Sequence, residues 1–323
     1  MITTELTTTS LGSTGMRITR VGFGGWAIGG GRGSGGGPQD DARSIATIEY
    51  ALECGINWID TAAAYGGGRS ESLIGKTLRG RGCRPYLFTK CSLPDNGTGR
   101  VRHRLTRDRV LRDAEASLDR LGAGALDLYQ IHWPKPDSEI EAGWAALAEL
   151  KDQGLVRHIG VSNFDGAQLD RISAIAPVET LRPAYSLVDR AAATTVLPHA
   201  ERAGIGVIAC TPLASGLLTG AMTRQRIARL PAADRRSWFR EPALSGHLDT
   251  AARTRRVADR HRVAPGAVAV AWVLADPAID AATIGFRHPA QIAAILPAAD
   301  LELTTDDLAE LAATARTAAG GRR

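Results

Sequence analysis

The chain has 323 residues, of which 44% are hydrophobic, and its formal net charge is +5. This length allows two average domains, but α/β barrels of about 250 residues are single domains, so length leaves both open. No apolar run reaches the roughly 18 residues that a membrane helix needs. Glu5 interrupts the N-terminus where a signal peptide would be apolar, so we expect a cytoplasmic protein without a membrane partner.

The glycine-rich segment GGGRGSGGGPQDD at 29–41 contains the spacing G-x-G-x-x-G of dinucleotide-binding loops in doubly wound folds. Such a fold needs its third glycine inside a helix that follows at once. Here Gly37 and Pro38 come next, and a helix is predicted only from about Asp40. We therefore interpret the segment as a flexible loop at the barrel mouth, with a contact between Arg32 and pyrophosphate as the open alternative.

From residue 21 onward, short apolar runs alternate with longer segments of helical period, a rhythm that is typical of parallel βα units. The predicted strands are 21–27, 56–60, 86–90, 126–132, 156–162, 181–185, 206–210 and 281–285. The predicted helices are 40–53, 69–79, 106–121, 138–152, 165–176, 191–203, a broken pair near 247–275, and 289–298. Eight such units fit a closed (β/α)8 TIM barrel better than an open sheet.

Segments outside these units complete the prediction. The segment 9–20 carries Ser-Thr-Gly between apolar ends and is expected to form an N-terminal β-hairpin that closes the barrel bottom. Residues 213–246 are expected to form a long loop over the barrel mouth, and 304–315 an extra C-terminal helix. We expect one barrel domain for the whole chain, 1–323, with a frayed tail at 317–323.

Two arginine-rich stretches, 100–109 and 224–240, raise the question of a nucleic-acid surface. The first lacks the interleaved aromatic residues of such surfaces, so we expect solvated faces and no nucleic-acid partner. The cysteines show no metal-ligand spacing, and we expect reduced thiols and no metal site. The sequence does not indicate an oligomeric state.

Polar residues end several of the apolar runs, and barrel enzymes place their active sites where strands meet the following loops. The second run ends in Asp60, the third in Lys90, the fourth in His132, and the fifth in Ser162 and Asn163. Each residue alone has an ordinary explanation as a cap, a surface charge or a packed imidazole. Because the strands are neighbours in a barrel, we expect these side chains to meet at one rim.

Tyr65 follows Asp60 by five residues, in the loop after the same strand. A phenol is ordinarily a weak acid at neutral pH, but a nearby ammonium such as that of Lys90 lowers its pKa. Asp60 could hold Lys90 charged, and His132 could hydrogen-bond a substrate oxygen. The set predicts that Tyr65 protonates an oxygen that gains negative charge, as a carbonyl oxygen does when its carbon receives hydride.

The segments GINWIDTAAAYG, FTK, LYQIHWP and GVSNF, in this order, resemble the signature segments of the aldo-keto reductases. The resemblance covers nearly the whole chain and implies a catalytic tetrad of Asp60, Tyr65, Lys90 and His132. It also implies a nicotinamide dinucleotide, usually NADPH, that binds extended across the barrel mouth. The implied activity is the reduction of an aldehyde, ketone or sugar-type carbonyl to the alcohol.

The resemblance further implies where the cofactor binds. At the nicotinamide end it implies Gly25, Trp26, Asp60, Ser162, Asn163, Arg182 and Tyr185. Of these, Ser162 and Asn163 would bind the carboxamide, and Tyr185 would stack on the nicotinamide ring. Along the pyrophosphate it implies Thr211, Pro212, Leu213, Ser215, Gly216 and Leu218. Small residues in this segment let backbone amides approach phosphate oxygens. At the adenosine end it implies Gly285, Phe286, Arg287 and Gln291. The guanidinium of Arg287 would bind a 2′-phosphate.

The sequence departs from the family in two places. Arg182 stands where a glutamine usually helps to hold the carboxamide. Ala294 and Ile295 stand where a Glu-Asn pair often reaches the adenine. The preference for NADPH over NADH is therefore left open.

Aromatic residues are expected to wall the substrate pocket, because such walls suit carbonyl compounds and sugar faces. The residues predicted to contact substrate are Trp26, Tyr65, His132, Trp133 and Trp238. Two alternatives stay open besides carbonyl reduction. One is the NADP-dependent oxidation of a sugar or secondary alcohol, and the other is a nucleotide-binding regulatory protein like the β subunits of potassium channels.

Overall fold

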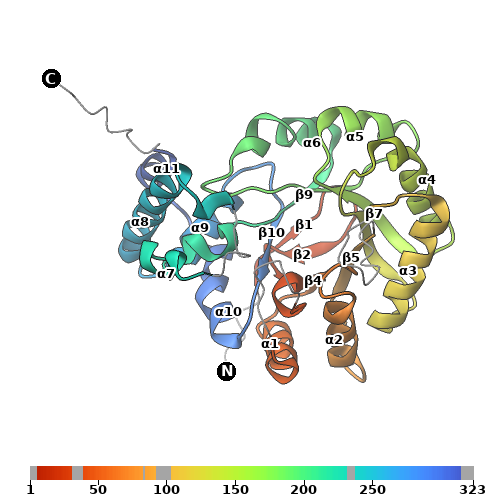
Figure 1. The fold of residues 1–323 in the computed structure, drawn as a ribbon, viewed down its shortest axis with the longest axis horizontal. Coiled ribbons are helices and arrows are strands. Elements are labelled where there is room, and N and C mark those ends of the chain that lie inside the picture. Colours follow the sequence, from red (N-terminus) through yellow and green to blue (C-terminus); the bar gives the residue numbers. More distant parts are fainter. Residues whose placement is uncertain (1–5, 31–38, 83, 92–102, 231–236, 314–323) are drawn as a thin grey trace.

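The computed structural model describes residues 6–30, 39–82, 84–91, 103–230 and 237–313. Within these ranges, eight parallel strands form a closed barrel with helices around it (Figure 1). The strands follow one another around the ring in chain order, and the last pairs with the first to close it. The predicted (β/α)8 barrel is confirmed.

The barrel strands lie within or next to the predicted apolar runs. They are β3 (Val21–Gly24), β4 (Trp58–Asp60), β5 (Tyr86–Cys91), β6 (Leu126–Ile131), β7 (Val156–Ser162), β8 (Thr180–Arg182), β9 (Gly206–Ala209) and β10 (Ala281–Gly285). Some runs leave the sheet early. The end of the first run turns into the 3-10 helix η1 (Gly25–Ile28), which carries a predicted pocket residue, Trp26.

The helices of the described chain are α1 (Asp41–Glu53), α2 (Arg69–Leu78), α3 (Arg107–Leu121), α4 (Ile140–Asp152), α5 (Gly166–Ser173), α6 (Leu197–Ala203), α7 (Arg224–Ala228), α8 (Ala243–His261), α9 (Pro265–Leu274), α10 (Pro289–Ile295) and α11 (Thr305–Ala312). Local residues fix several ends. The side chain of Asp40 accepts a hydrogen bond from the Arg43 amide and starts α1. Gly122 takes the left-handed conformation that ends α3.

A hairpin of β1 (Thr8–Ser10) and β2 (Arg17–Thr19) closes one end of the barrel, as predicted (Figure 1). Leu11, Met16 and Ile18 from the hairpin segment pack in one cluster with residues inside the ring, which include Trp58, Phe88, Leu128 and Ile208. This apolar plug fills the end of the barrel at which the strands begin.

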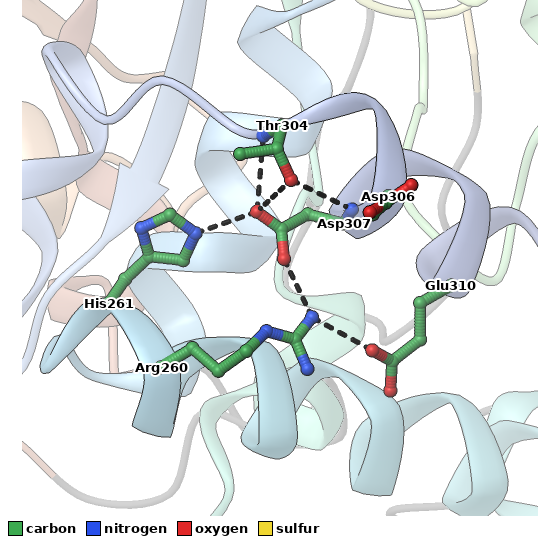
Figure 2. A pocket seen from close by; sticks show the side chains of 6 residues that line it. All are labelled: Arg260, His261, Thr304, Asp306, Asp307 and Glu310. Carbon is green, nitrogen blue, oxygen red and sulfur yellow. Dashed lines mark hydrogen bonds and ion pairs between the residues drawn. The ribbon is translucent and has the colours of Figure 1, made fainter.

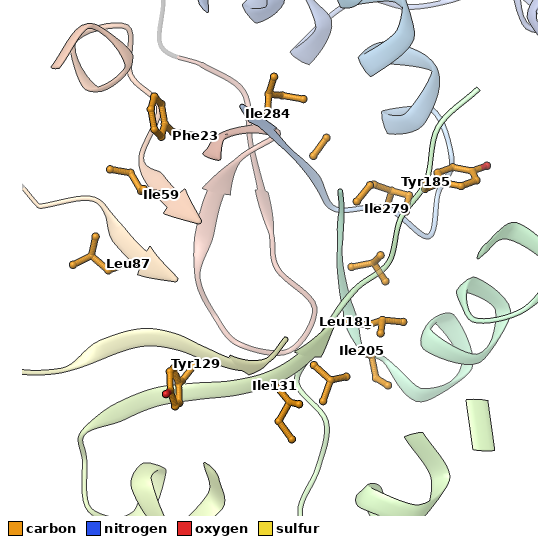
Figure 3. Close-up of a cluster of buried hydrophobic side chains, with 14 of the residues drawn as sticks. Phe23, Ile59, Leu87, Tyr129, Ile131, Leu181, Tyr185, Ile205, Ile279 and Ile284 are labelled. Atoms are coloured by element: carbon orange, nitrogen blue, oxygen red, sulfur yellow. The ribbon is translucent and has the colours of Figure 1, made fainter. Parts of the chain in front are cut away.

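Side chains alternate between the inside and the outside of the barrel along each strand. Outward residues such as Ile59, Leu87 and Leu181 form the core between the ring and the helices (Figure 3). Trp58 and Phe88 point inward to the plug, so the residues two positions later, Asp60 and Lys90, also point inward, above it. The alternation thus builds a polar layer inside the barrel.

The segment 213–246 is more regular than predicted. It contains η4 (Ala214–Thr219), α7, η5 (Ser237–Phe239) and the first residues of α8. Leu217 and Leu218 are buried in a cluster with Val257 of α8, so this part of the segment is docked on that helix. The expectation of a long irregular loop was wrong because short helical turns carry too few residues to show a period.

Helix α11, the predicted extra C-terminal helix, is held on α8 by a charged cluster (Figure 2). The carboxylate of Asp307 is buried and accepts a hydrogen bond from Arg260 Nη2 at 2.6 Å. His261 Nε2 lies 2.7 Å from Asp307 Oδ2, and Thr304 caps the helix by accepting from the Asp307 amide. Arg260 also reaches Glu310, at 2.8 Å, so one guanidinium ties two turns of α11 to α8.

Most of the glycine-rich segment, 31–38, and the tail 317–323 lie outside the described residues. None of the described helices has both the length and the apolar character of a membrane span. The cytoplasmic location and the single domain over 1–323 stay predictions.

Candidate active site

Lys90 of β5 and Asp60 of β4 form a buried ion pair inside the barrel. Lys90 Nζ donates to Asp60 Oδ1 at 2.6 Å and to the carbonyl oxygen of Thr61 at 2.7 Å. Burial lowers the pKa of Lys90 to about 8, although the carboxylate of Asp60 acts in the opposite direction. Because an unpaired ammonium is costly in a buried position, Asp60 is the group that keeps Lys90 charged and in place.

Tyr65 and His132 lie next to this pair. Lys90 Nζ is 5.5 Å from the centre of the Tyr65 ring. The Tyr65 and His132 rings meet edge to face, with their centroids 5.7 Å apart. The structure therefore brings together the four residues that were predicted as a tetrad, from β4, the loop after it, β5 and the end of β6.

Gly25 allows the Tyr65 loop to lie close to η1. A Cβ atom at Gly25 would be 2.6 Å from Ser70 Oγ and 2.9 Å from Thr61 Oγ1. Ser70 Oγ donates to the Gly25 carbonyl oxygen at 2.9 Å, and Thr61 Oγ1 donates to Ser70 Oγ at 2.9 Å. Any larger residue would separate η1 from the loop that carries Tyr65.

Arg182 extends from the end of β8 across the inside of the barrel to the same carboxylate. Its Nη2 lies 3.0 Å from Asp60 Oδ2, and its guanidinium also interacts with the Tyr65 hydroxyl. Asp60 thus lies between two cations, Lys90 on one oxygen and Arg182 on the other. The sequence predicted Arg182 beside the carboxamide, and its direct contact with the tetrad was missed.

The surroundings set the protonation of Tyr65 and His132. Burial raises the pKa of Tyr65 above its ordinary value, Arg182 acts against this, and Asp60 adds to it. Tyr65 is therefore a phenol at neutral pH, and the cation that acts on its hydroxyl is Arg182 rather than the predicted Lys90. Burial, Lys90 and Arg182 together hold the pKa of His132 well below its usual range, so the imidazole is neutral.

Cys210 is a further residue near the tetrad that the sequence did not single out. It is buried, and it lies near Tyr65, Lys90 and Arg182. Its position was nevertheless visible in the sequence, because it ends the apolar run 206–210 just as Asp60 ends its own.

The predicted carboxamide pair is tied to the tetrad. Ser162 Oγ donates to the Arg182 carbonyl oxygen at 3.0 Å. Asn163 Nδ2 donates to Ser162 Oγ and to the His132 carbonyl oxygen, both at 2.9 Å. Asn163 also has a φ of 63°, a conformation that asparagine tolerates better than most residues. The pair thus has a fixed place between β6 and β8.

Tyr185 does not lie where the resemblance implied. It belongs to the outer core between the ring and the helices (Figure 3). Its ring packs on Trp272 of α9, with centroids 5.2 Å apart, and its hydroxyl donates to Asp276 Oδ2 at 3.0 Å. Arg182 points inward, so Tyr185, three residues later, points outward. A stacking role on the nicotinamide does not fit this placement and is not retained.

The segment predicted to lie along the pyrophosphate has several unusual backbone conformations. Thr211, Ala214, Ser215 and Gly216 all have positive φ angles, between 45° and 94°. Such conformations are costly for the non-glycine residues and let successive amides face one side. The predicted contacts of Pro212, Leu213 and Leu218 are limited to their backbone, because these side chains pack into the fold, with Leu218 fully buried.

The segment predicted at the adenosine end follows β10. The Arg287 amide donates to Gln291 Oε1 at 2.7 Å, and Gln39 Nε2 donates to the Arg287 carbonyl oxygen at 2.9 Å. Phe286 is buried against Phe23, so its side chain belongs to the core and not to a binding surface. The neighbouring Gly285 is exposed.

The predicted substrate wall is partly assembled. Trp133 is 38% exposed and lies nearly parallel to the His132 ring, with centroids 6.2 Å apart. Trp26 is half-buried on η1. Trp238 packs with the cluster under η4 and α8, and its carbonyl oxygen lies 3.0 Å from His247 Nδ1. Its contact with substrate stays a prediction.

Comparison with known proteins places these features in a family. The model of the "Aldo/keto reductase family" matches residues 20–316. The chain is 37% identical to the aldo-keto reductase YhdN of Bacillus subtilis, over 93% of this chain and 90% of that protein. It is 30% identical to the NADH-specific methylglyoxal reductase of Escherichia coli, over 92% of this chain and 94% of that protein.

A solved structure gives the same result. The glycerol dehydrogenase AKR11B4 from Gluconobacter oxydans superposes with a TM-score of 0.85 and 31% identity, over 96% of this chain and 94% of that chain. The barrel, the family match over most of the chain and these relatives agree. The chain belongs to the aldo/keto reductase family and is an NAD(P)-dependent oxidoreductase.

Proposed function

We propose that the protein reduces an aldehyde, ketone or sugar-type carbonyl to the alcohol with NADPH, and that Tyr65 is the general acid. The observation that supports this most is the buried Lys90–Asp60 pair, 2.6 Å apart, directly beside the phenol of Tyr65. A protonated tyrosine next to fixed positive charge is suited to giving up a proton and remaining as a stabilised phenolate.

Each member of the site has a distinct task in this proposal. The nicotinamide, when bound, supplies the hydride to the carbonyl carbon. Tyr65 donates its proton to the carbonyl oxygen, and the phenolate left behind is stabilised by the guanidinium of Arg182 and the charge of Lys90. His132, being neutral, can hold the substrate oxygen by a hydrogen bond without competing for the proton. Solvent then returns a proton to Tyr65.

The residues that would hold the cofactor fit an extended dinucleotide. The loop from Thr211 to Gly216, in which Thr211, Ala214, Ser215 and Gly216 have positive φ angles, would bind the pyrophosphate through backbone amides. A Cβ added to Gly216 would meet nothing within 4 Å, so the chain is open to an approaching group there. Ser162 and Asn163 would hold the carboxamide, and the hydrogen bond between them supports this by fixing their positions.

The preference for NADPH rests on Arg287. A guanidinium matches the geometry of a 2′-phosphate, and the segment that carries Arg287 is fixed by Gln291. One relative is described as NADH-specific, so the choice is tested directly. The change Arg287→Ala should weaken NADPH binding at least about tenfold and leave NADH binding nearly unchanged. Equal losses for both nucleotides would contradict this role of Arg287.

The change Tyr65→Phe tests the proposed function. It should leave the dissociation constant of NADPH near its original value and lower the rate of carbonyl reduction at least about hundredfold. Methylglyoxal is a reasonable first substrate, because a relative carries that name. Phe239→Tyr, an equally small change outside the tetrad, is the matched control. Full activity of the Tyr65→Phe protein would refute the role of Tyr65.

The reverse reaction, oxidation of a polyol or secondary alcohol, is the second candidate function. A structural neighbour at 31% identity is named as a glycerol dehydrogenase, which favours testing it. Initial rates with methylglyoxal plus NADPH, and with glycerol plus NADP+, should be compared at pH 7. We expect the reductive rate to exceed the oxidative rate, since Tyr65 is protonated in this environment.

A further inference from the structure

Arg182 gives the buried site more positive than negative charge. Asp60 is its carboxylate, whereas Lys90 and Arg182 are two cations in contact with it, at 2.6 and 3.0 Å. Tyr65 and His132 are neutral because of the burial described above. The sum over this set is one unit of positive charge, held inside the barrel with little solvent to screen it.

This excess depends on the residue at position 182. An uncharged residue there would leave Lys90 and Asp60 as a balanced pair. The carbonyl oxygen of Arg182 accepts the hydrogen bond from Ser162, which belongs to the proposed carboxamide pair. The charged side chain therefore starts from the strand end beside the proposed nicotinamide position.

We propose that this excess charge makes the protein discriminate between the two redox states of its cofactor, binding the reduced dinucleotide more tightly than the oxidised one. The two states share the pyrophosphate, both riboses and the adenine. They differ at the nicotinamide, which carries a positive charge when oxidised and none when reduced. The inference rests on the proposed cofactor site. It adds to that function a specificity-determining role for Arg182.

The expected size follows from Coulomb's law. Two unit charges about 12 Å apart, at an effective dielectric constant near 20, repel by about 1.4 kcal/mol, which is a tenfold change in affinity. A cation closer to the nicotinamide than this has a larger effect. At a separation of about 12 Å, wild-type protein is expected to bind NADPH about tenfold more tightly than NADP+, and to release the oxidised product readily.

The experiment measures the dissociation constants of NADPH and NADP+ by isothermal titration calorimetry, without substrate. Arg182→Gln should bring their ratio to within about threefold of one, because it removes the excess charge. Arg182→Lys should preserve the ratio, because it keeps the charge. Arg157→Gln is the matched control, since it removes an exposed guanidinium at the opposite end of the barrel and should leave the ratio unchanged.

Each outcome has a defined meaning. Equal affinities of the wild type for the two states, or a ratio that Arg182→Gln does not change, would overturn the inference while leaving the proposed function intact. If the wild type binds neither nucleotide, the proposed function itself fails. Where Arg182→Gln does not fold, Lys90→Met serves as the second variant. It also removes one cation, and it should reduce the ratio in the same way.

Discussion

Lys90 Nζ lies 2.6 Å from Asp60 Oδ1, and neither side chain is exposed to solvent. Arg182 approaches the other oxygen of the same carboxylate, at 3.0 Å. Asp60 is therefore the group on which two buried cations depend. Its removal affects stability as well as catalysis.

The change Asp60→Asn should lower the free energy of unfolding by about 3–5 kcal/mol, because it leaves Lys90 and Arg182 uncompensated in a buried position. Urea denaturation followed by circular dichroism measures this. Asp152→Asn makes the same chemical change at an exposed position on α4 and should be nearly neutral. Equal stability of the two variants would show that the cations do not depend on Asp60.

The titration of Lys90 should appear in the pH profile of the reaction. Burial and Arg182 lower its pKa from 10.5 to about 8, so the folded protein loses this charge at a lower pH than the unfolded chain does. The buried charge of Lys90 therefore lowers the free energy of unfolding below about pH 8. This penalty disappears as the pH rises from about 8 to 10.5. The reduction rate should fall above about pH 8, since the neutral amine no longer adds its charge, 5.5 Å from the centre of the Tyr65 ring, to the stabilisation that Arg182 gives the phenolate.

Initial rates from pH 6 to 10 test this, with Lys90→Met as the comparison. The variant should be slow throughout and should lack the decline above about pH 8. A decline of the same size in the variant would assign the titration to another group.

Glu71 is fully buried on α2 and depends on Arg120 of α3, whose Nε donates to Glu71 Oε2 at 2.7 Å. The other carboxylate oxygen of Glu71 accepts a hydrogen bond from Thr89 Oγ1 of β5 at 2.6 Å, and Thr89 directly precedes Lys90 in the chain. Arg120→Ala should therefore destabilise the protein by about 3–5 kcal/mol, because a buried carboxylate loses its partner. Arg112→Ala, on an exposed part of the same helix, should cost less than about 0.5 kcal/mol in the same thermal or urea melts.

Glu179 should govern part of the acid sensitivity. Burial alone would raise its pKa, but hydrogen bonds from His158, Lys151 and the Ile159 amide outweigh this and lower it to about 2. A lowered carboxyl pKa adds stability above the unfolded value of 4.5 that is lost as the pH falls toward about 2. Glu179→Gln should flatten the stability profile in that range, whereas Glu115→Gln on the exposed face of α3 should not.

The barrel and the tetrad could be predicted because both depend on local patterns. Apolar runs place the strands, and the residue that ends each run lies at one rim whatever the details of packing. Asp60, Lys90 and His132 were found in this way. The short helices within 213–246 could not be predicted in this way, since their structure depends on the burial of Leu217 and Leu218 against α8.

The contact of Arg182 with Asp60 crosses the barrel between strands that are not neighbours. Nothing local to position 182 indicates how far its side chain reaches, so the sequence showed the departure from the family but not its effect. The direction of Tyr185, by contrast, was available from strand alternation. A residue three positions from an inward one in extended chain faces outward, whereas the resemblance implied that Tyr185 faces the nicotinamide.

The change Tyr185→Phe tests that correction. It removes the hydroxyl that donates to Asp276 Oδ2 and keeps the ring that packs on Trp272. The free energy of unfolding should fall by about 1–2 kcal/mol, because Asp276 loses a hydrogen-bond donor. Tyr185→Ala should lower the free energy of unfolding further, by about 3–5 kcal/mol, since the ring fills the outer core. The NADPH dissociation constant of the folded Tyr185→Phe protein should stay within about twofold of the wild-type value. A ring that stacked on the nicotinamide would instead make Tyr185→Ala lose cofactor affinity without a comparable loss of stability.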